Sequence, residues 1–412
     1  MQNYPDLDVD FVRNQFSALN GEWAFMENAG GTLTARQVVH RVQDYMSRIH
    51  VQPNHLYRPS QEAGQLIEKG HNAISQMIGA DQDEVIISPN TTASVLFLAN
   101  SLRRWFSAGD EIIVTNLDHE ANNGVWRKLN EFGLIIKEWH FSKDSGALEI
   151  DSLESLLTSK TRMVCFTHCS NITGAINDIP ALVSLIHHAG ALACVDGVAY
   201  APHRGVDVKS WDVDFYLCSL YKIYGPHLGV LYAKREHLER AANNNHSFLE
   251  NKLSLKLNPG GPNHELTCGI AGVEDYFLDL YKHHFTSSEN TILEKIIDLG
   301  GLISKHEEVI SKPLVDFLSI KRNVTLFGPS SVDSKVRTPI FSFVVEGRNS
   351  AEIVKTLDQE GIGIGSGHFY APRCLEALGH DSSEGGFIRV SLVHYNSKSD
   401  IMRLIAALEK II

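Results

Sequence analysis

Seven short runs of β-branched and apolar residues alternate with longer helical patterns between residues 84 and 234, and this alternation constrains the fold more than any other feature. Strands that are apolar along their whole length are typical of a parallel sheet with helices on both faces. In such sheets, ligands bind beyond the carboxyl ends of the strands. We therefore predict an α/β fold with its site at the ends of these runs. The runs are EVIIS from 84, EIIVT from 111, GLIIKEW from 133, RMVCFTH from 162, ALACVDG from 191, DFYLCS from 214 and LGVLYA from 228.

The pattern changes after about residue 285, where long helical stretches precede three β-rich runs and a closing helix. This order is typical of an α+β domain. No Gly/Ser-rich linker and no repeat separates the two regions, so we expect the domains to pack closely. We predict an N-terminal segment, 1–20, that packs on the small domain, a large domain with a mainly parallel sheet, 21–284, and a smaller α+β C-terminal domain, 285–412.

Charge and cysteine usage restrict the partners and the compartment. The net charge is −12 at pH 7, which argues against nucleic acid or an anionic membrane as the main partner. No run approaches the ~18 apolar residues that span a bilayer, and the first residues show no pattern of a secretory signal. The six cysteines are scattered and lie mostly in apolar runs, which is typical of buried thiols in a reducing compartment. We expect a cytoplasmic protein.

Several common motifs are absent. The stretch GIGIGSGHF, 361–369, contains no register of G-x-G-x-x-G, and the lysine of a P-loop is missing. HEANN, from 119, is not H-E-x-x-H because position 123 is Asn. The two His-His pairs are adjacent in sequence and diverge on a helix, so we predict no metal site.

A set of polar residues remains at the ends of the predicted strands. Taken singly, each has an ordinary explanation: a helix N-cap, a loop side chain that satisfies the backbone, or a surface lysine. Hydroxyl and N–H groups at a helix start also favour a phosphate. The set comprises Lys222, Asp196, Asn171, His119 and the helix start at Thr91 and Thr92.

Together these groups suit one cofactor, pyridoxal 5′-phosphate (PLP). Its aldehyde needs an amine that can be unprotonated, which a desolvated Lys222 would supply. Its pyridine nitrogen needs a carboxylate, Asp196, to stay protonated so that the ring can accept electrons. Its 3′-oxygen needs a donor such as Asn171, and its ring face needs a flat group such as His119. Its phosphate needs the helix start at Thr91 and Thr92.

Stretches over nearly the whole chain resemble the class V aminotransferase family of fold-type I PLP enzymes, and within it the cysteine desulfurase-like branch. The steps of 26 residues from Asp196 to Lys222 and of 52 residues from His119 to Asn171 match cysteine desulfurases without a gap. The resemblance implies the fold-type I PLP-transferase architecture and a PLP cofactor. It rests on MENAGGT, SPNTTAS, NLDHEANN, THCSNITGAINDI, VDGVAYAPHRGVDV, SLYKIYGPHLG, NPGGPNHE, SGHFYAPR and IRVSLVHYN.

The resemblance also implies roles around the cofactor. Lys222, His119 and Asp196 become the catalytic residues: Lys222 bonds to the aldehyde, and His119 stacks on the ring and shuttles protons. Thr92 and Ser219 contact the phosphate. Tyr221 stands where kynureninases, of the same class, use a tyrosine on the phosphate.

Further roles concern the second subunit and the substrate. Gly261 replaces a phosphate-contacting threonine of desulfurases, in a loop that reaches the partner subunit's cofactor, which implies a homodimer. Arg389 binds the substrate carboxylate in a bidentate clamp. The other substrate-binding candidates are Asn28, His368 and Tyr370.

The chain differs from desulfurases at positions that bear on the type of reaction. Tyr370 stands where these enzymes carry the nucleophilic cysteine, Gly365 replaces an arginine before it, and Ala199 replaces a glutamine. Cys374 lies four residues beyond Tyr370. A phenol cannot form a persulfide.

We therefore expect a PLP enzyme that acts on a small amino acid, with C–S β-elimination from a cysteine-like substrate as the favoured reaction. A cysteine desulfurase that uses Cys374 is the second reading, and an aminotransferase or epimerase is the third. A non-catalytic binding protein with this fold is the alternative of a different class, which the joint retention of Lys222, Asp196, His119 and Arg389 disfavours.

Overall fold

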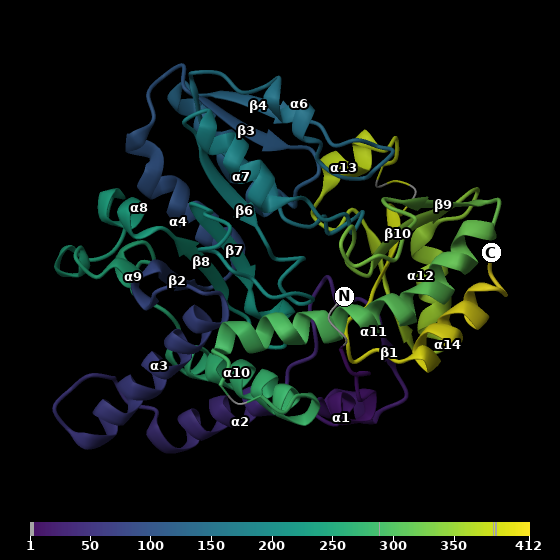
Figure 1. Ribbon diagram of the computed structural model, residues 1–412, viewed down its shortest axis with the longest axis horizontal. Helices are drawn as coiled ribbons and strands as arrows, with labels where there is room; N and C mark the ends of the chain where they lie inside the picture. The colour runs from purple at the N-terminus through teal and green to yellow at the C-terminus, as the bar shows by residue number, and fades with distance from the viewer. Residues whose placement is uncertain (1–3, 288, 382, 384) are drawn as a thin grey trace.

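The computed structural model describes residues 4–287, 289–381, 383 and 385–412. Its largest element is a seven-stranded sheet with strand order β2-β8-β7-β6-β5-β3-β4 (Figure 1). β8 is antiparallel to both of its neighbours, and the other pairs of neighbours are parallel. This confirms the predicted mainly parallel sheet. Its strands are β2 Val85–Ser88, β3 Glu111–Thr115, β4 Ile135–Trp139, β5 Thr161–Thr167, β6 Leu192–Asp196, β7 Phe215–Ser219 and β8 Gly229–Ala233.

Both faces of this sheet are covered, as the continuous apolar runs predict. Along β7, Tyr216 and Cys218 belong to one buried cluster, whereas Phe215 and Leu217 belong to a second cluster on the opposite face. Alternate residues of a strand point to opposite faces, so each strand supplies side chains to two cores. The helices and helical turns of this region are α2 Arg36–Asp44, α3 Arg58–Met77, α4 Thr91–Leu102, α5 Gly124–Arg127, α6 Ile150–Glu154, α7 Ile179–His188, α8 Arg235–Arg240, α9 Leu253–Lys256 and α10 His264–His284.

A second, smaller body follows in the sequence and has its own core. Its antiparallel sheet has the order β12-β13-β10-β9. The three β-rich runs of this region form β9 Val324–Phe327, β10 Ile340–Val345 and β13 Phe387–Ser391. β12, Gly365–Gly367, was not predicted because its Gly-Ser-Gly sequence carries no apolar signal. The helices are α11 Ile292–Ile320, α12 Ser350–Asp358, α13 Pro372–Ala377 and α14 Lys398–Leu408.

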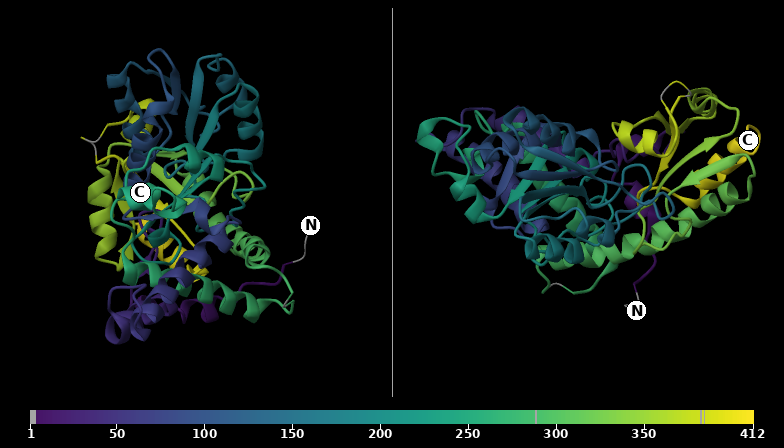
Figure 2. Two further views of the ribbon diagram at one scale, coloured as in Figure 1. Left: turned by 90° about the vertical axis from the view of Figure 1, so that its left-hand side faces the viewer. Right: turned by 90° about the horizontal axis from the view of Figure 1, so that it is seen from above.

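Several contacts join the bodies, among them those of helix α11 and of the N-terminal segment. Helix α11 packs on α3 and α10 at the large body and on α14 and β9 at the small one, and Figures 1 and 2 show it extending from one to the other. The N-terminal strand β1, Ala24–Phe25, pairs in parallel with β11, Ile362–Gly363. The segment that contains β1 is thereby anchored to the small body.

The N-terminal segment contacts both bodies. Within it, α1 spans Val9–Arg13. Arg13 Nη1 donates to Tyr395 O and to Asp400 Oδ2, each at 3.0 Å, while the Phe11 ring stacks on His283 at the end of α10 with centroids 3.8 Å apart. The domain boundaries stay a prediction. Among the described residues, no helix combines the length and apolar character needed to cross a membrane.

Candidate active site

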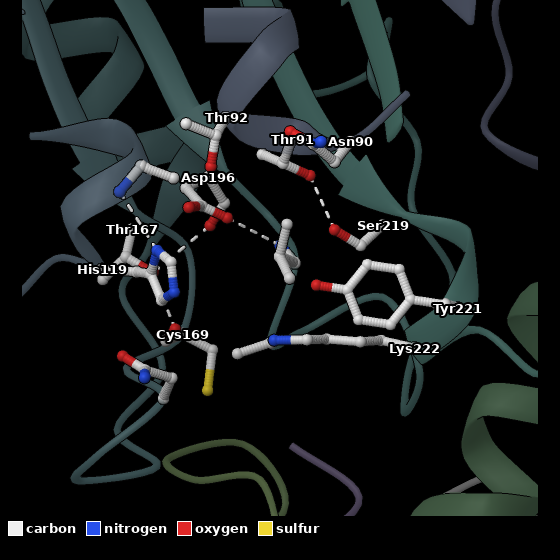
Figure 3. Close-up of a pocket in the computed structure, with 14 residues that line it drawn as sticks. Asn90, Thr91, Thr92, His119, Thr167, Cys169, Asp196, Ser219, Tyr221 and Lys222 are labelled. Atoms are coloured by element: carbon white, nitrogen blue, oxygen red, sulfur yellow. Dashed lines mark hydrogen bonds between the residues drawn. The ribbon is translucent and has the colours of Figure 1, made fainter. Parts of the chain in front are cut away.

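A cavity of about 480 Å³, which includes the space at its mouth, lies at the carboxyl ends of the parallel strands (Figure 3). Eight of the predicted site residues line it together, although they come from distant parts of the sequence. The lining residues are Asn90, Thr91, Thr92, His119, Ala121, Thr167, Cys169, Asn171, Asp196, Val198, Ala199, Ser219, Tyr221 and Lys222.

One end of the cavity is the start of α4. Asn90 caps this helix, and its side chain accepts a hydrogen bond from Ala93 N–H at 2.9 Å. The Thr91 and Ser219 hydroxyls are 2.6 Å apart. The first N–H groups of a helix have no partner within it and attract anions. Gly229 permits this arrangement, because a Cβ there would lie 2.7 Å from Thr91 N.

Lys222 lies in the helical turn directly after β7 and is 7% exposed. Burial and the nearby positive charge of Arg389 lower its pKa to about 8, while the Asp196 carboxylate acts in the opposite direction. A fraction of the amine is therefore neutral near physiological pH. Figure 3 shows Tyr221 beside it, with its hydroxyl directed toward the cavity.

Asp196 is the last residue of β6 and is buried at the floor of the cavity. Its Oδ1 accepts a hydrogen bond from Val198 N–H at 2.9 Å, and burial raises its pKa. A ligand with a positively charged N–H would stabilise this carboxylate by an ion pair.

His119 is neutral in this site. Burial, followed by the charges of Lys222 and Arg389, lowers its pKa to about 3. Its Nδ1 accepts a hydrogen bond from Ala121 N–H at 3.1 Å, so the ring proton resides on Nε2. The ring of Tyr370 stacks on it with centroids 5.3 Å apart and planes inclined by 26°.

Asn171 connects the cavity to Arg389. The side-chain Nδ2 of Asn171 donates to Phe369 O at 3.0 Å. Its backbone carbonyl oxygen accepts from Arg389 Nη1 at 3.1 Å. Arg389 is 2% exposed and also pairs with Glu27 through Nη2. The guanidinium carbon lies 3.7 Å from the centre of the Phe369 ring. Arg389 thus lies behind the cavity wall formed by Asn171.

The other predicted residues do not line this cavity. Asn28 is buried, and its Nδ2 donates to Ser391 O at 2.8 Å, while its Oδ1 accepts from Tyr395. Its amide therefore ties two segments together and is not free for a substrate. His368 accepts a hydrogen bond from Tyr370 N–H through Nδ1 at 3.1 Å. Gly261 has φ of 87° and lies in the loop after α9.

Cys374 and Cys169 differ in their position relative to the cavity. Cys374 is fully buried, and burial raises the pKa of its thiol well above the ordinary value. Cys169 was not among the predicted site residues but lines the cavity. Its thiol lies 3.0 Å from Thr338 Oγ1 and 3.3 Å from Gly174 O, and burial raises its pKa to about 11. Both thiols are protonated at physiological pH.

Two acidic residues of the site were also missed. Glu27 stands beside Asn28 in a stretch that was singled out, but no pattern in one sequence marks its pairing with Arg389. Asp118 precedes His119, and its carboxylate accepts from Asn122 Nδ2 at 2.8 Å and Thr167 N–H at 3.1 Å. Burial, aided by the charge of Asp196, raises the pKa of Asp118 to about 8. Among the described residues, no three His, Cys, Asp or Glu side chains are placed to hold a metal ion.

Comparisons with known proteins show the family to which the chain belongs. The family model described as aminotransferase class-V matches residues 24–404. The chain belongs to the class V aminotransferase family. It is therefore an enzyme of a family whose members depend on PLP.

Several relatives match almost end to end. The chain is 35% identical to the aminotransferase-like protein FGM3 of Gibberella zeae, over 98% of both chains. It is 33% identical to the cysteine desulfurase-like protein ustD of Aspergillus flavus, over 98% of this chain and 91% of that protein. The solved cysteine desulfurase of Thermococcus onnurineus, at 24% identity, superposes with a TM-score of 0.85 over 100% of this chain and 98% of the other. The match to this solved structure shows the fold alone.

Proposed function

We propose that this protein binds PLP through Lys222 and acts on a small amino acid. The residues of the cavity fit the cofactor: a partly neutral buried amine, a buried carboxylate, an imidazole ring and the start of a helix. PLP, when bound, withdraws electrons from the bonds at the substrate's Cα. Thr91, Thr92, Ser219 and the α4 N–H groups would hold the phosphate, with Tyr221 beside them.

The protein groups then have distinct tasks. Asp196 holds the proton of the pyridine nitrogen, and neutral His119 covers one face of the ring. The Lys222 amine removes the proton at Cα, because a neutral amine of lowered pKa is an effective base near neutral pH. Asn171 donates to the 3′-oxygen, and Arg389 binds the substrate carboxylate. The loop at 259–263 would complete the partner's site in a homodimer.

Among the reactions open to such a site, we propose β-elimination of sulfur from a cysteine-like substrate. The observation that carries this choice is that, among the described residues, no thiol is available in the cavity. Tyr370 stands at the position of the nucleophile, Cys374 is buried outside the cavity, and the Cys169 thiol is protonated and hydrogen-bonded. In elimination, the C–S bond breaks, the sulfur leaves with the bonding electrons, and the proton lost from Cα goes to Lys222. This path requires no enzyme thiol.

The products distinguish the alternatives. Elimination from cysteine or an S-substituted cysteine yields pyruvate and ammonia, whereas desulfuration moves sulfur to an enzyme thiol and leaves alanine. The purified protein loaded with PLP should be incubated with these substrates and the carbon products identified. Alanine as the main product would contradict the proposal.

Transamination is the second candidate, because FGM3 carries the name of an aminotransferase-like protein and shares 35% identity. It starts with the same removal of the Cα proton. Amino transfer to an added 2-oxo acid, without release of ammonia, would favour this candidate.

A further inference from the structure

Arg389, the proposed anchor of the substrate carboxylate, already pairs with a carboxylate of its own chain. Nη2 donates to one oxygen of Glu27. The Glu27 side chain is 36% exposed, whereas that of Arg389 is 3% exposed. The pair therefore joins the buried guanidinium of Arg389 to the partly exposed carboxylate of Glu27.

The pairing leaves the guanidinium incompletely satisfied. Nη1 is taken by Asn171 O at 3.1 Å, and one face rests on the Phe369 ring. The buried Nε has no hydrogen-bond partner among the described residues. Glu27 accepts a hydrogen bond from Nη2 only. Of the two nitrogens along this edge of the guanidinium, Nε and Nη2, one therefore has no acceptor. A carboxylate that bridges both nitrogens makes one more charge-assisted hydrogen bond than Glu27 does.

Two glycines make the space for Glu27. A Cβ at Gly30 would overlap the Glu27 carboxylate. A Cβ at Gly365 would lie 3.0 Å from Glu27 Cγ and 2.8 Å from Phe369 Cε1. Position 365 is the one where desulfurases, by the resemblance above, carry an arginine. A larger residue at position 365 would remove the space that Glu27 fills.

We propose that Glu27 is a displaceable internal carboxylate that determines specificity by competing with the substrate for Arg389. A ligand whose carboxylate bridges Nε and Nη2 displaces Glu27, and a neutral amide derivative does not. Glu27 keeps Arg389 oriented in the free enzyme and lowers its affinity for every carboxylate ligand. This inference rests on the proposed role of Arg389.

The test is an equilibrium titration of the PLP-loaded protein with L-alanine and with L-alaninamide, followed by the absorbance of the bound cofactor. In Glu27→Gln, the dissociation constant of L-alanine should fall about five- to tenfold, because a neutral amide competes weakly for the guanidinium. That of L-alaninamide should change less than about twofold, because this ligand makes no ion pair with Arg389.

Two further variants make the result specific. Glu27→Asp keeps the charge but shortens the side chain, so it should also strengthen alanine binding. Glu120→Gln removes another acid near the cavity that does not touch Arg389, and it should leave both constants unchanged.

Unchanged or weaker alanine binding in both Glu27 variants overturns the proposal, and so does equal tightening in Glu120→Gln, which would indicate a general charge effect. If L-alanine leaves the absorbance unchanged in every variant, Arg389 is not a carboxylate site and the proposal falls. Borohydride labelling of Lys222 then tells whether the cofactor assignment still stands.

Discussion

The region proposed to hold the cofactor and the region proposed to hold the substrate are built differently. The first consists of strand ends of a single sheet and a helix start, where Asp196 is the last residue of β6 and Lys222 follows β7. The second is assembled from the N-terminal segment, the loop after β12 and strand β13 of the small body. There, Phe369 and Tyr370 have positive φ of 47° and 58°, a conformation that costs free energy in residues other than glycine.

The difference indicates where reactions can diverge in this family. A residue at the end of a paired strand is held in place by the hydrogen bonds of that strand. A loop anchored at its ends can change its side chains without disturbing the core. Two of the differences from desulfurases, Tyr370 and Gly365, lie in the region proposed to hold the substrate. Glu27, which the sequence did not single out, lies there as well. We therefore expect differences in the reaction to arise mainly in the region proposed to hold the substrate.

The largest expected effect concerns Lys222. Lys222→Ala should abolish turnover, because it removes both the amine that bonds to the cofactor and the base at Cα. Borohydride reduction of the wild-type protein, followed by peptide mapping, should place the pyridoxyl group on Lys222. A label on another lysine would contradict the assignment of the cofactor side.

Asp196→Asn should retain PLP but reduce turnover by ~100-fold or more, the loss seen when a preorganised electrostatic contact is removed. An amide cannot keep the pyridine nitrogen protonated, although it preserves the shape of the site. The measurement is kcat together with the stoichiometry of bound PLP. Turnover close to that of the wild type would exclude the electron-sink role of Asp196.

Arg389→Lys tests the substrate side. The lysine keeps the positive charge but not the planar fork, so KM for the amino acid should rise roughly 10- to 100-fold, the range expected for charge-assisted hydrogen bonds. PLP content should stay unchanged, because Arg389 lies behind Asn171. A loss of PLP with unchanged KM would place Arg389 on the cofactor side.

A smaller effect follows from the lowered pKa of Lys222, about 8 in the free protein. Only the neutral amine attacks the aldehyde, so the rate of PLP uptake by the apoprotein should rise with pH and level off above the pKa. The rise should be about fivefold between pH 7 and 8 and less than about twofold above that. A rate that still climbs about tenfold per pH unit between pH 8 and 9 would indicate an ordinary lysine.

The same contrast limits what the sequence can predict. The apolar runs fix the strands of the central sheet, and strand ends bring Asp196, His119 and Lys222 to one edge regardless of their separation in the chain. β12 escaped prediction because glycine and serine carry no periodic signal. The pairing of Glu27 with Arg389 joins residues 362 positions apart, and only the folded small body brings them together. Asn28 stands in a matching stretch, and its amide bonds to other parts of the protein, so its role toward a substrate stays a prediction.

The smallest expected effect is that of Cys374→Ala. This variant tests whether Cys374, four residues beyond Tyr370, serves as the nucleophile. Cys374 lies in α13, has no exposed surface, and belongs to the main core cluster. A persulfide there would require the helix to open, and burial keeps its thiol protonated. Pyruvate formation from a cysteine derivative should therefore stay within about twofold of the wild type, because the proton transfer resides on Lys222. The substitution removes one buried sulfur atom and should lower the free energy of unfolding by about 1–2 kcal/mol, which thermal unfolding measures separately. If alanine is formed by the wild type and disappears in Cys374→Ala at temperatures where the variant is folded, the substrate side does carry a displaced nucleophile, and the enzyme is a desulfurase.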